Sequence, residues 1–224
     1  MALTLAIGNK NYSSWSFRPW IAMKVAGIAF DEVVIPLYQP ESKARILAYS
    51  AAGKVPVLDD NGVRVWDSLA IIEYLAERFP GAGLWPADRV ARAEARAVSA
   101  EMHSGFLPLR RACPMNMWRK VIRRELAADA RDNVRRIEEL WAGCRRRHGA
   151  GGPFLFGDFC AADAMYAPVV ARFHTYDIEV DTPARDYMAA LMALPAWAEW
   201  VGAARHEPWV VPDFEVDWPN VPKA

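Results

Sequence analysis

The sequence predicts a chain in two parts: a mixed α/β region over residues 1–80 and an all-helical region over residues 89–224, joined by a linker at residues 81–88. Short β-type runs alternate with helical stretches up to residue 80, whereas only helical periodicity follows residue 88. Hydrophobic residues make up 53% of the 224 residues and charged residues 24%, so a sizeable core is expected and disorder is not.

A strand–helix–strand unit opens the chain. We expect a strand at Leu3–Ile7, a helix that includes Pro19–Val25, and a second strand at Glu32–Ile35. Two strands joined through one helix over so short a stretch are parallel neighbours in a sheet. A short helix at Ser42–Tyr49 follows.

A hairpin and a helix complete the first region. The runs Val57–Leu58 and Val63–Trp66 flank Asp59-Asp60-Asn61-Gly62, and Asn-Gly is a strong signal for a tight hairpin turn. Ser68–Phe79 has helical spacing of its apolar residues, and Pro80-Gly81 ends it. The expected order is β-α-β-α-β-β-α.

The second region is predicted to be helical throughout, apart from its end. The tail Pro208–Ala224 contains four prolines and no helical periodicity. The expected helices cover Arg89–Ser104, residues 116–147, Asp163–Tyr176, Ala184–Ala193 and Pro195–Ala204.

Charge is balanced overall but unevenly distributed. Residues 89–147 contain 15 basic and 7 acidic side chains, and residues 148–224 contain 4 basic and 11 acidic ones. A basic segment can indicate nucleic-acid binding. Here the basic residues are spaced as solvated helix faces without interleaved aromatic residues, so we expect basic helices beside acidic ones and no nucleic-acid partner.

The apolar runs and the cysteines indicate the cellular compartment of the protein. No run approaches the ~18–20 apolar residues that span a bilayer, and the first residues lack the basic lead-in of a secretory signal. The three cysteines, Cys113, Cys144 and Cys160, form neither a metal-binding spacing nor a disulfide framework. We therefore expect a cytoplasmic protein with no membrane partner and no metal.

Hydroxyl groups crowd the start of the first predicted helix. Ser13 and Ser14 stand where a helix N-cap belongs, and ordinary capping explains them. Alternatively, the free N–H groups and the positive end of the helix dipole form an anion site, where a hydroxyl could donate a hydrogen bond to a thiolate. Taken alone, the segment favours capping.

Two further clusters lie at strand ends. Pro56 stands at the start of a predicted strand. An edge strand tolerates a trans proline at this position; alternatively, a cis Val55–Pro56 bond presents the backbone of Val55 outward. Asp67 and Ser68 stand at the start of a helix, where they can act as its cap. Alternatively, they bind a zwitterionic head group, with Ser68 holding its carboxylate and Asp67 facing its cation. A thiolate, a peptide backbone and an α-amino-acid end are the three parts of glutathione.

These segments carry a resemblance to a known family. GKVPVLDDNGVRVWDSLAIIEYLAERFP (residues 53–80) resembles the glutathione-site segment of the cytosolic glutathione S-transferases. SSWSFRPWIAMKVAG (residues 13–27) resembles the serine motif of the zeta class, with Trp15 in place of its cysteine. The resemblance covers nearly the whole chain, more weakly after residue 88. It implies a thioredoxin-like domain followed by an all-helical domain.

The resemblance also implies roles for individual residues. Ser13 aligns with the serine that hydrogen-bonds the glutathione sulfur, and Ser14 with the second serine of the motif. Lys54 falls near the glycyl end of glutathione, the backbone of Val55 near its cysteinyl part with Pro56 cis, and Asp67 and Ser68 at its γ-glutamyl group. The family's helical capping box reads Cys160-Ala-Ala-Asp163, in which Asp163 can accept from backbone N–H groups but the thiol is a poor cap.

By this resemblance the protein is a homodimeric glutathione transferase, a detoxifying enzyme that joins the thiolate of its co-substrate to a small electrophile. A glutathione-dependent isomerase acting on maleylacetoacetate is the alternative, although the arginine which that class uses aligns with Thr175. A non-catalytic interaction protein of the same fold is a third. The expected electrophile pocket lies between the domains and is lined by Asn11, Tyr12, Met102, His103, Phe106, Arg110, Phe173 and Tyr176.

Overall fold

The computed structural model describes residues 3–216. Its sheet has the order β2-β1-β3-β4, formed by β1 (Leu3–Ile7), β2 (Phe30–Val34), β3 (Val57–Asp60) and β4 (Val63–Trp66). Strand β1 is parallel to β2 and antiparallel to β3, and β3 pairs with β4 through the hairpin. The strand–helix–strand unit and the hairpin are confirmed, with β2 beginning two residues before the expected strand.

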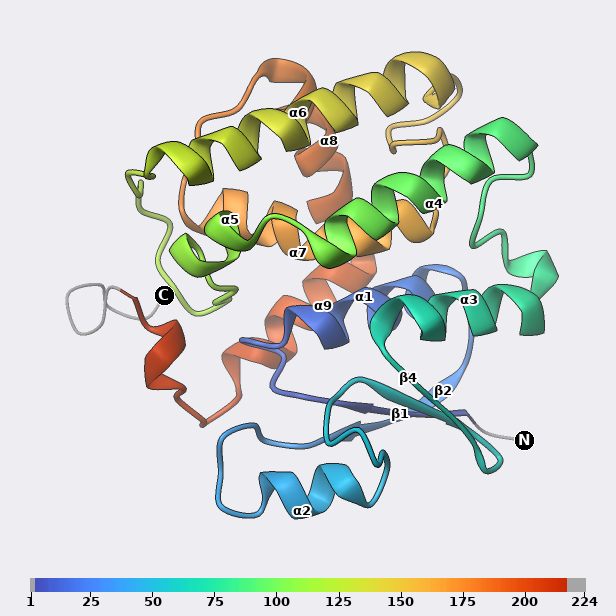
Figure 1. Cartoon of the computed structure of the whole chain (residues 1–224), viewed down its shortest axis with the longest axis vertical. Coiled ribbons are helices and arrows are strands. Elements are labelled where there is room, and N and C mark those ends of the chain that lie inside the picture. Colours follow the sequence, from blue (N-terminus) through green and yellow to red (C-terminus); the bar gives the residue numbers. More distant parts are fainter. Residues whose placement is uncertain (1–2, 217–224) are drawn as a thin grey trace.

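Helices cover both faces of this sheet (Figure 1). Helices α1 (Ser14–Val25) and α3 (Ser68–Arg78) pack on the face toward the rest of the chain, and α2 (Ser42–Leu47) lies on the opposite face. The alternation of β1 explains the two layers: Leu5 and Ile7 join the main core, whereas Ala6 packs with Ile46 of α2.

The second region is all-helical, as predicted. Two 3₁₀ turns, Pro80–Ala82 and Pro212–Phe214, lie before and after its helices. The helices are α4 (Arg89–Ser104), α5 (Leu107–Ala112), α6 (Ala128–His148), α7 (Ala161–Thr175), α8 (Thr182–Met192) and α9 (Pro195–Arg205). The described part of the tail runs to residue 216, and the remainder of the predicted irregular segment lies outside the described residues.

The helix expected over residues 116–147 begins only at Ala128, so this expectation was wrong in its first third. The backbone N–H of Trp118 donates to the Asn11 side chain at 2.9 Å, and that of Met117 to the Asn11 carbonyl at 3.3 Å. The N–H of Arg124 donates to the carbonyl of Tyr176 at 3.0 Å. These tertiary partners replace the i−4 carbonyls that a helix would supply.

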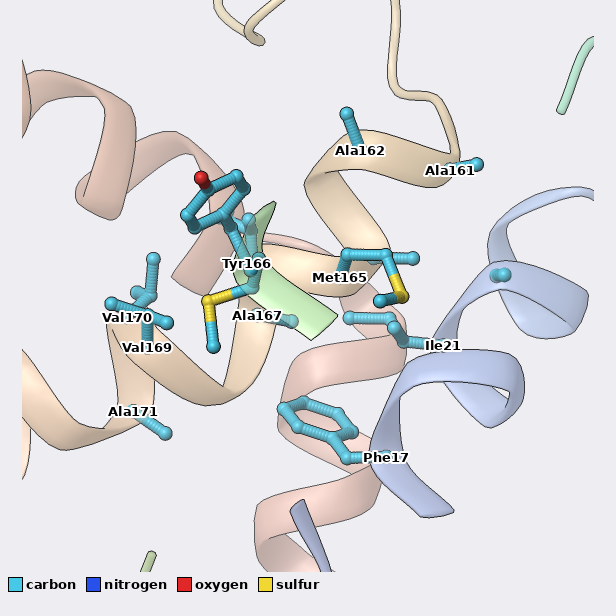
Figure 2. Close-up of a cluster of buried hydrophobic side chains, with 14 of the residues drawn as sticks. Phe17, Ile21, Ala161, Ala162, Met165, Tyr166, Ala167, Val169, Val170 and Ala171 are labelled. Atoms are coloured by element: carbon cyan, nitrogen blue, oxygen red, sulfur yellow. The ribbon is translucent and has the colours of Figure 1, made fainter. Parts of the chain in front are cut away.

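One hydrophobic core spans both regions, with α7 at its centre. Figure 2 shows Phe17 and Ile21 of α1 directed toward α7, where Met165 lies beside Ile21. All three side chains have no exposed surface. Because α1 packs on α7, the start of α1 is held at the boundary between the sheet and the helices. The division of the chain into two domains with a linker at residues 81–88 stays a prediction.

Arginines of the basic segment form ion pairs with acidic side chains. Arg96 pairs with Glu73 at 2.9 Å and Arg136 with Glu101 at 2.8 Å, and Arg147 contacts Glu94. None of these three acids lies in the acidic segment after residue 148, so the expected pairing of basic with acidic helices stays a prediction. All three cysteines are free, buried thiols. Within residues 3–216, no helix combines the length and hydropathy needed to cross a membrane.

The start of α7 is held by Asp163, as expected from the capping box. Its carboxylate, fully buried, accepts from the backbone N–H of Cys160 at 2.9 Å and from that of Leu155 at 3.1 Å. The acid thus satisfies two buried donors and joins the preceding loop to the central helix.

We predict that Asp163→Ala lowers the free energy of unfolding by about 2–4 kcal/mol, since two buried N–H groups lose their acceptor at ~1–3 kcal/mol each. Chemical denaturation followed by circular dichroism measures this change. Asp158→Ala, which removes an exposed carboxylate from the same loop, is the control and should have little effect. Equal losses in the two variants would contradict the role given to Asp163.

Candidate functional site

The sheet register brings the three sequence clusters to one edge. Strand β1 runs antiparallel to β3 with Ala6 opposite Val57, so the chain leaving β1 passes beside the Val55–Pro56 bond that precedes β3. Val57 also pairs with Trp66, and Asp67 follows Trp66 directly. The Val55–Pro56 bond is cis, as the resemblance implied. The serines, the proline turn and the Asp67-Ser68 pair are therefore neighbours.

Ser13 is the N-cap of α1. Its Oγ accepts from the backbone N–H of Ser16 at 3.4 Å and donates to the Ser16 Oγ at 2.7 Å. The Ser16 Oγ in turn accepts from the N–H of Gly8, at the end of β1, at 3.0 Å. The capping explanation is therefore realised, and a chain of hydrogen bonds joins the Ser13 hydroxyl to the sheet.

Ser16 is a residue that sequence reasoning did not assign to the site. Its spacing from Ser13 is that of a capping box, with a serine where glutamate or glutamine is usual, and this spacing was the available signal. Ser14, the first residue of α1, is also buried, and its N–H donates to the Tyr12 carbonyl at 2.9 Å. Both Ser13 and Ser14 therefore stay candidates for the hydroxyl that contacts sulfur.

Asp67 and Ser68 form the start of α3. The Asp67 Oδ1 accepts from the N–H groups of Leu69 and Ala70 at 2.9 and 3.3 Å, so the acid caps the helix. Its φ angle of 77° lies in the left-handed region, a strained conformation for a residue other than glycine. Such strain persists where the surrounding structure enforces it and is concentrated at ligand sites.

A buried arginine lies directly behind this helix start. Arg18 has no exposed surface, and its Nη1 donates to the Ser68 Oγ at 3.2 Å. Within the described part of the chain its Nε and Nη2 have no hydrogen-bond partner. Burial, together with repulsion from Arg110 and Arg172, holds the pKa of Arg18 well below its ordinary value. This end of the site therefore carries excess positive charge, which a bound carboxylate would offset.

Two of the predicted pocket residues join this end of the site. The ring of Trp15 lies under the Arg18 guanidinium at 4.2 Å and near the Arg110 guanidinium at 5.2 Å. His103 meets Trp15 edge-on, with ring centroids 5.2 Å apart. Arg110 also donates to the carbonyls of Gly105 and Met102, near the turn between α4 and α5.

Asn11 and Tyr12 belong to a second group, closed by the C-terminal segment. The Tyr12 hydroxyl donates to Glu215 at 2.5 Å, and its ring stacks on Phe214 with centroids 5.7 Å apart. Burial, followed by the Glu215 hydrogen bond, raises the pKa of Tyr12. Trp118, bonded to Asn11, packs edge-on against the same ring.

The other predicted pocket residues are buried or distant from these groups. Phe173 packs against Trp141 in the helical core at 5.5 Å, and the Tyr176 hydroxyl donates to the Pro114 carbonyl at 2.8 Å. Met102 and Phe106 are buried near the end of α4, and Lys54 is exposed. A separate cavity of about 440 Å³, lined by Trp85, His148 and Phe159 among others, contains none of the predicted site residues.

The chain is similar to known proteins in both sequence and fold. Residues 12–78 match the model of the glutathione S-transferase N-terminal domain, and residues 116–203 match that of the C-terminal domain. A maleylacetoacetate isomerase of Rhizobium meliloti (strain 1021) is 34% identical over 178 residues, covering 75% of this chain and 81% of that protein.

A probable maleylacetoacetate isomerase of Caenorhabditis elegans is 38% identical over 97 residues, but this match spans only 43% of this chain and 45% of the relative. The crystal structure of a glutathione transferase homolog from Burkholderia GL BGR1, with bound glutathione, has 24% identity and a TM-score of 0.68, covering 92% of this chain and 98% of that one. The latter likeness bears on the fold alone. From the matches together, the chain belongs to the glutathione S-transferase family and resembles its zeta class.

Proposed function

We propose that this enzyme ionises the thiol of glutathione at the start of α1 and conjugates the thiolate to a small electrophile. The observation that carries the proposal is the junction of α1 with the cis-proline turn and the Asp67-Ser68 pair. Lys54 would lie near the glycyl carboxylate, the backbone of Val55 beside the cysteinyl part with Pro56 cis, and Asp67 and Ser68 at the γ-glutamyl group.

The helix start has the means to stabilise a thiolate. A free thiol has a pKa near ~8.5, and lowering it by ~2 units corresponds to ~2.7 kcal/mol of differential stabilisation. One charge-assisted hydrogen bond from a hydroxyl, together with the positive end of the α1 dipole, reaches that magnitude. The positive charges of Arg18 and Arg110 act in the same direction.

Ser13 can serve this role without acting as a base. When its hydroxyl turns from Ser16 toward a bound sulfur, the Ser16 hydroxyl can donate to the Ser13 Oγ while still accepting from Gly8. This arrangement keeps every hydroxyl group satisfied in the complex. Chains of hydrogen bonds of this kind strengthen the terminal donor.

The electrophile pocket is proposed over the sulfur, between α1 and the helices. Trp15, His103 and Arg110 border it on one side, and Asn11 and Tyr12 with the C-terminal segment on the other. Methionine and aromatic side chains suit apolar electrophiles, and Arg110 favours one that carries negative charge.

Isomerisation of maleylacetoacetate is the second candidate activity. The relatives named as isomerases favour it, whereas Thr175 and Trp15 depart from the class pattern. A turnover panel with glutathione separates the two: aryl halides and organic peroxides report transferase and peroxidase activity, and maleylacetoacetate reports the isomerase. Turnover of maleylacetoacetate alone would favour the second candidate.

We expect Ser13→Ala to lower kcat/KM by roughly 10- to 1000-fold and to raise the apparent thiol pKa, the effect of losing one donor to an anion. Glutathione affinity should change far less, because the γ-glutamyl and backbone contacts remain. pH–rate profiles measure both quantities. Ser14→Ala is the matched variant: an inactive Ser14→Ala enzyme beside an unchanged Ser13→Ala profile would transfer the role to Ser14.

Ser68→Ala is predicted to weaken glutathione binding by about tenfold, as expected for a lost hydrogen bond to a charged group worth ~1.5 kcal/mol. Isothermal titration calorimetry measures the dissociation constant. Ser42→Ala, at the start of the short helix α2, is a serine control outside the site. Equal affinity in wild type and Ser68→Ala would show that Ser68 does not hold the γ-glutamyl group.

We also propose a homodimer in the cytoplasm, with α3 facing the basic helix pair of the partner. Two apolar side chains of the edge strand β4, Val63 and Trp66, are half exposed beside α3 and fit this surface. Light scattering at micromolar concentration should give twice the chain mass of 25.1 kDa. A mass of one chain at that concentration would contradict the dimer.

A further inference from the structure

Asp67 already has a side-chain partner in the structure. One carboxylate oxygen, Oδ1, caps α3 through two backbone N–H groups. The other, Oδ2, lies 3.2 Å from the Nε2 of His103, a residue of α4 in the other half of the chain. The oxygen that would receive the ammonium group of a γ-glutamyl ligand is therefore already in contact with an imidazole.

The surroundings of His103 make this contact its main favourable interaction. Its Nδ1 is buried without a hydrogen-bond partner among residues 3–216, and the edge of its ring lies against Trp15. The charged groups that face it are Asp67 at the start of α3, Arg18 of α1 and Arg110 of α5. Asp67 is the one anion among these three.

We propose that His103 takes the place of the ligand's ammonium group on Asp67 in the free protein, and that glutathione binds by displacing His103. This inference rests on the proposed glutathione site. It makes His103 a specificity-determining residue: a ligand must bring a cation of its own to replace the imidazole on Asp67. A glutathione analogue that lacks the α-amino group leaves His103 in place and loses that interaction.

The displacement couples binding to protonation. In the free protein, burial lowers the pKa of His103, the Asp67 carboxylate raises it, and Arg18 and Arg110 lower it. The displaced imidazole stays buried against Trp15, so when the ligand's ammonium group takes Asp67, His103 loses the one neighbour that favours its charged form and its pKa falls further. The complex therefore holds fewer protons than the free protein, and affinity falls as the pH falls through the free-protein pKa of His103.

S-methylglutathione tests this directly, because it keeps the ammonium group and both carboxylates but has no thiol to titrate. We expect calorimetric dissociation constants to rise by roughly threefold or more between about pH 7 and about pH 5, a range in which histidine changes charge. His103→Gln, which keeps an N–H donor without a charge, should bind with the same affinity across this range. His174→Gln, at an exposed position of α7, is the matched control and should follow the wild type.

The outcomes separate this inference from the proposed function. If binding by the wild type does not depend on pH, or if His103→Gln keeps the pH dependence of the wild type, the proposed displacement of His103 is overturned while glutathione binding is left intact. No binding of S-methylglutathione at any pH by folded protein overturns both.

An NMR titration of the wild-type protein tests the same inference without any variant. The ring proton of His103, followed by NMR, should titrate at a lower pH in the S-methylglutathione complex than in the free protein. An equal or higher titration pH in the complex would overturn the inference.

Discussion

The packing of α1 between the sheet and the helical region is the constraint on which the rest of the molecule depends. Phe17 and Ile21 fix the helix against α7 (Figure 2). Phe17 also stacks on Trp200 of α9, with ring centroids 4.6 Å apart. The end of α1 that carries Ser13 consequently points to the boundary between the two halves. In the proposed function, a thiolate held there would face residues of α4 and α5 across that boundary, where a second substrate could be selected independently of the first.

Charge is concentrated at this boundary in a way that a folded core does not usually tolerate. Arg18 is buried beside Ser68 with two nitrogen atoms lacking partners in the described part of the chain, and burial lowers the pKa of Arg172 to about 9. Burying a cation without a counter-ion costs several kcal/mol, and active sites retain such arrangements where a ligand completes them. Under the proposed function, the γ-glutamyl carboxylate of glutathione would supply the missing negative charge.

The C-terminal segment closes the same boundary from the other side. Glu207 accepts from the backbone N–H groups of Lys10 and Asn11 at 2.7 and 2.9 Å, and Glu215 accepts from Tyr12. These bonds tie residues after α9 to the loop that precedes Ser13 and Ser14. The shape of the proposed electrophile pocket would therefore depend on residues nearly two hundred positions apart in the chain.

The sequence by itself predicted the order of strands and helices in the first region, the hairpin, most helices and the three clusters of the proposed glutathione site. These follow from periodicity, turn chemistry and helix starts, which are local, and from the motif resemblance. Tertiary structure decided the rest. It made residues 116–127 irregular, because Asn11 and Tyr176 compete for their backbone N–H groups. It also placed Phe173 against Trp141, and joined Arg18 to Ser68 and His103 to Asp67. No local pattern encodes the last two contacts, because they form only when α1, α3 and α4 pack together.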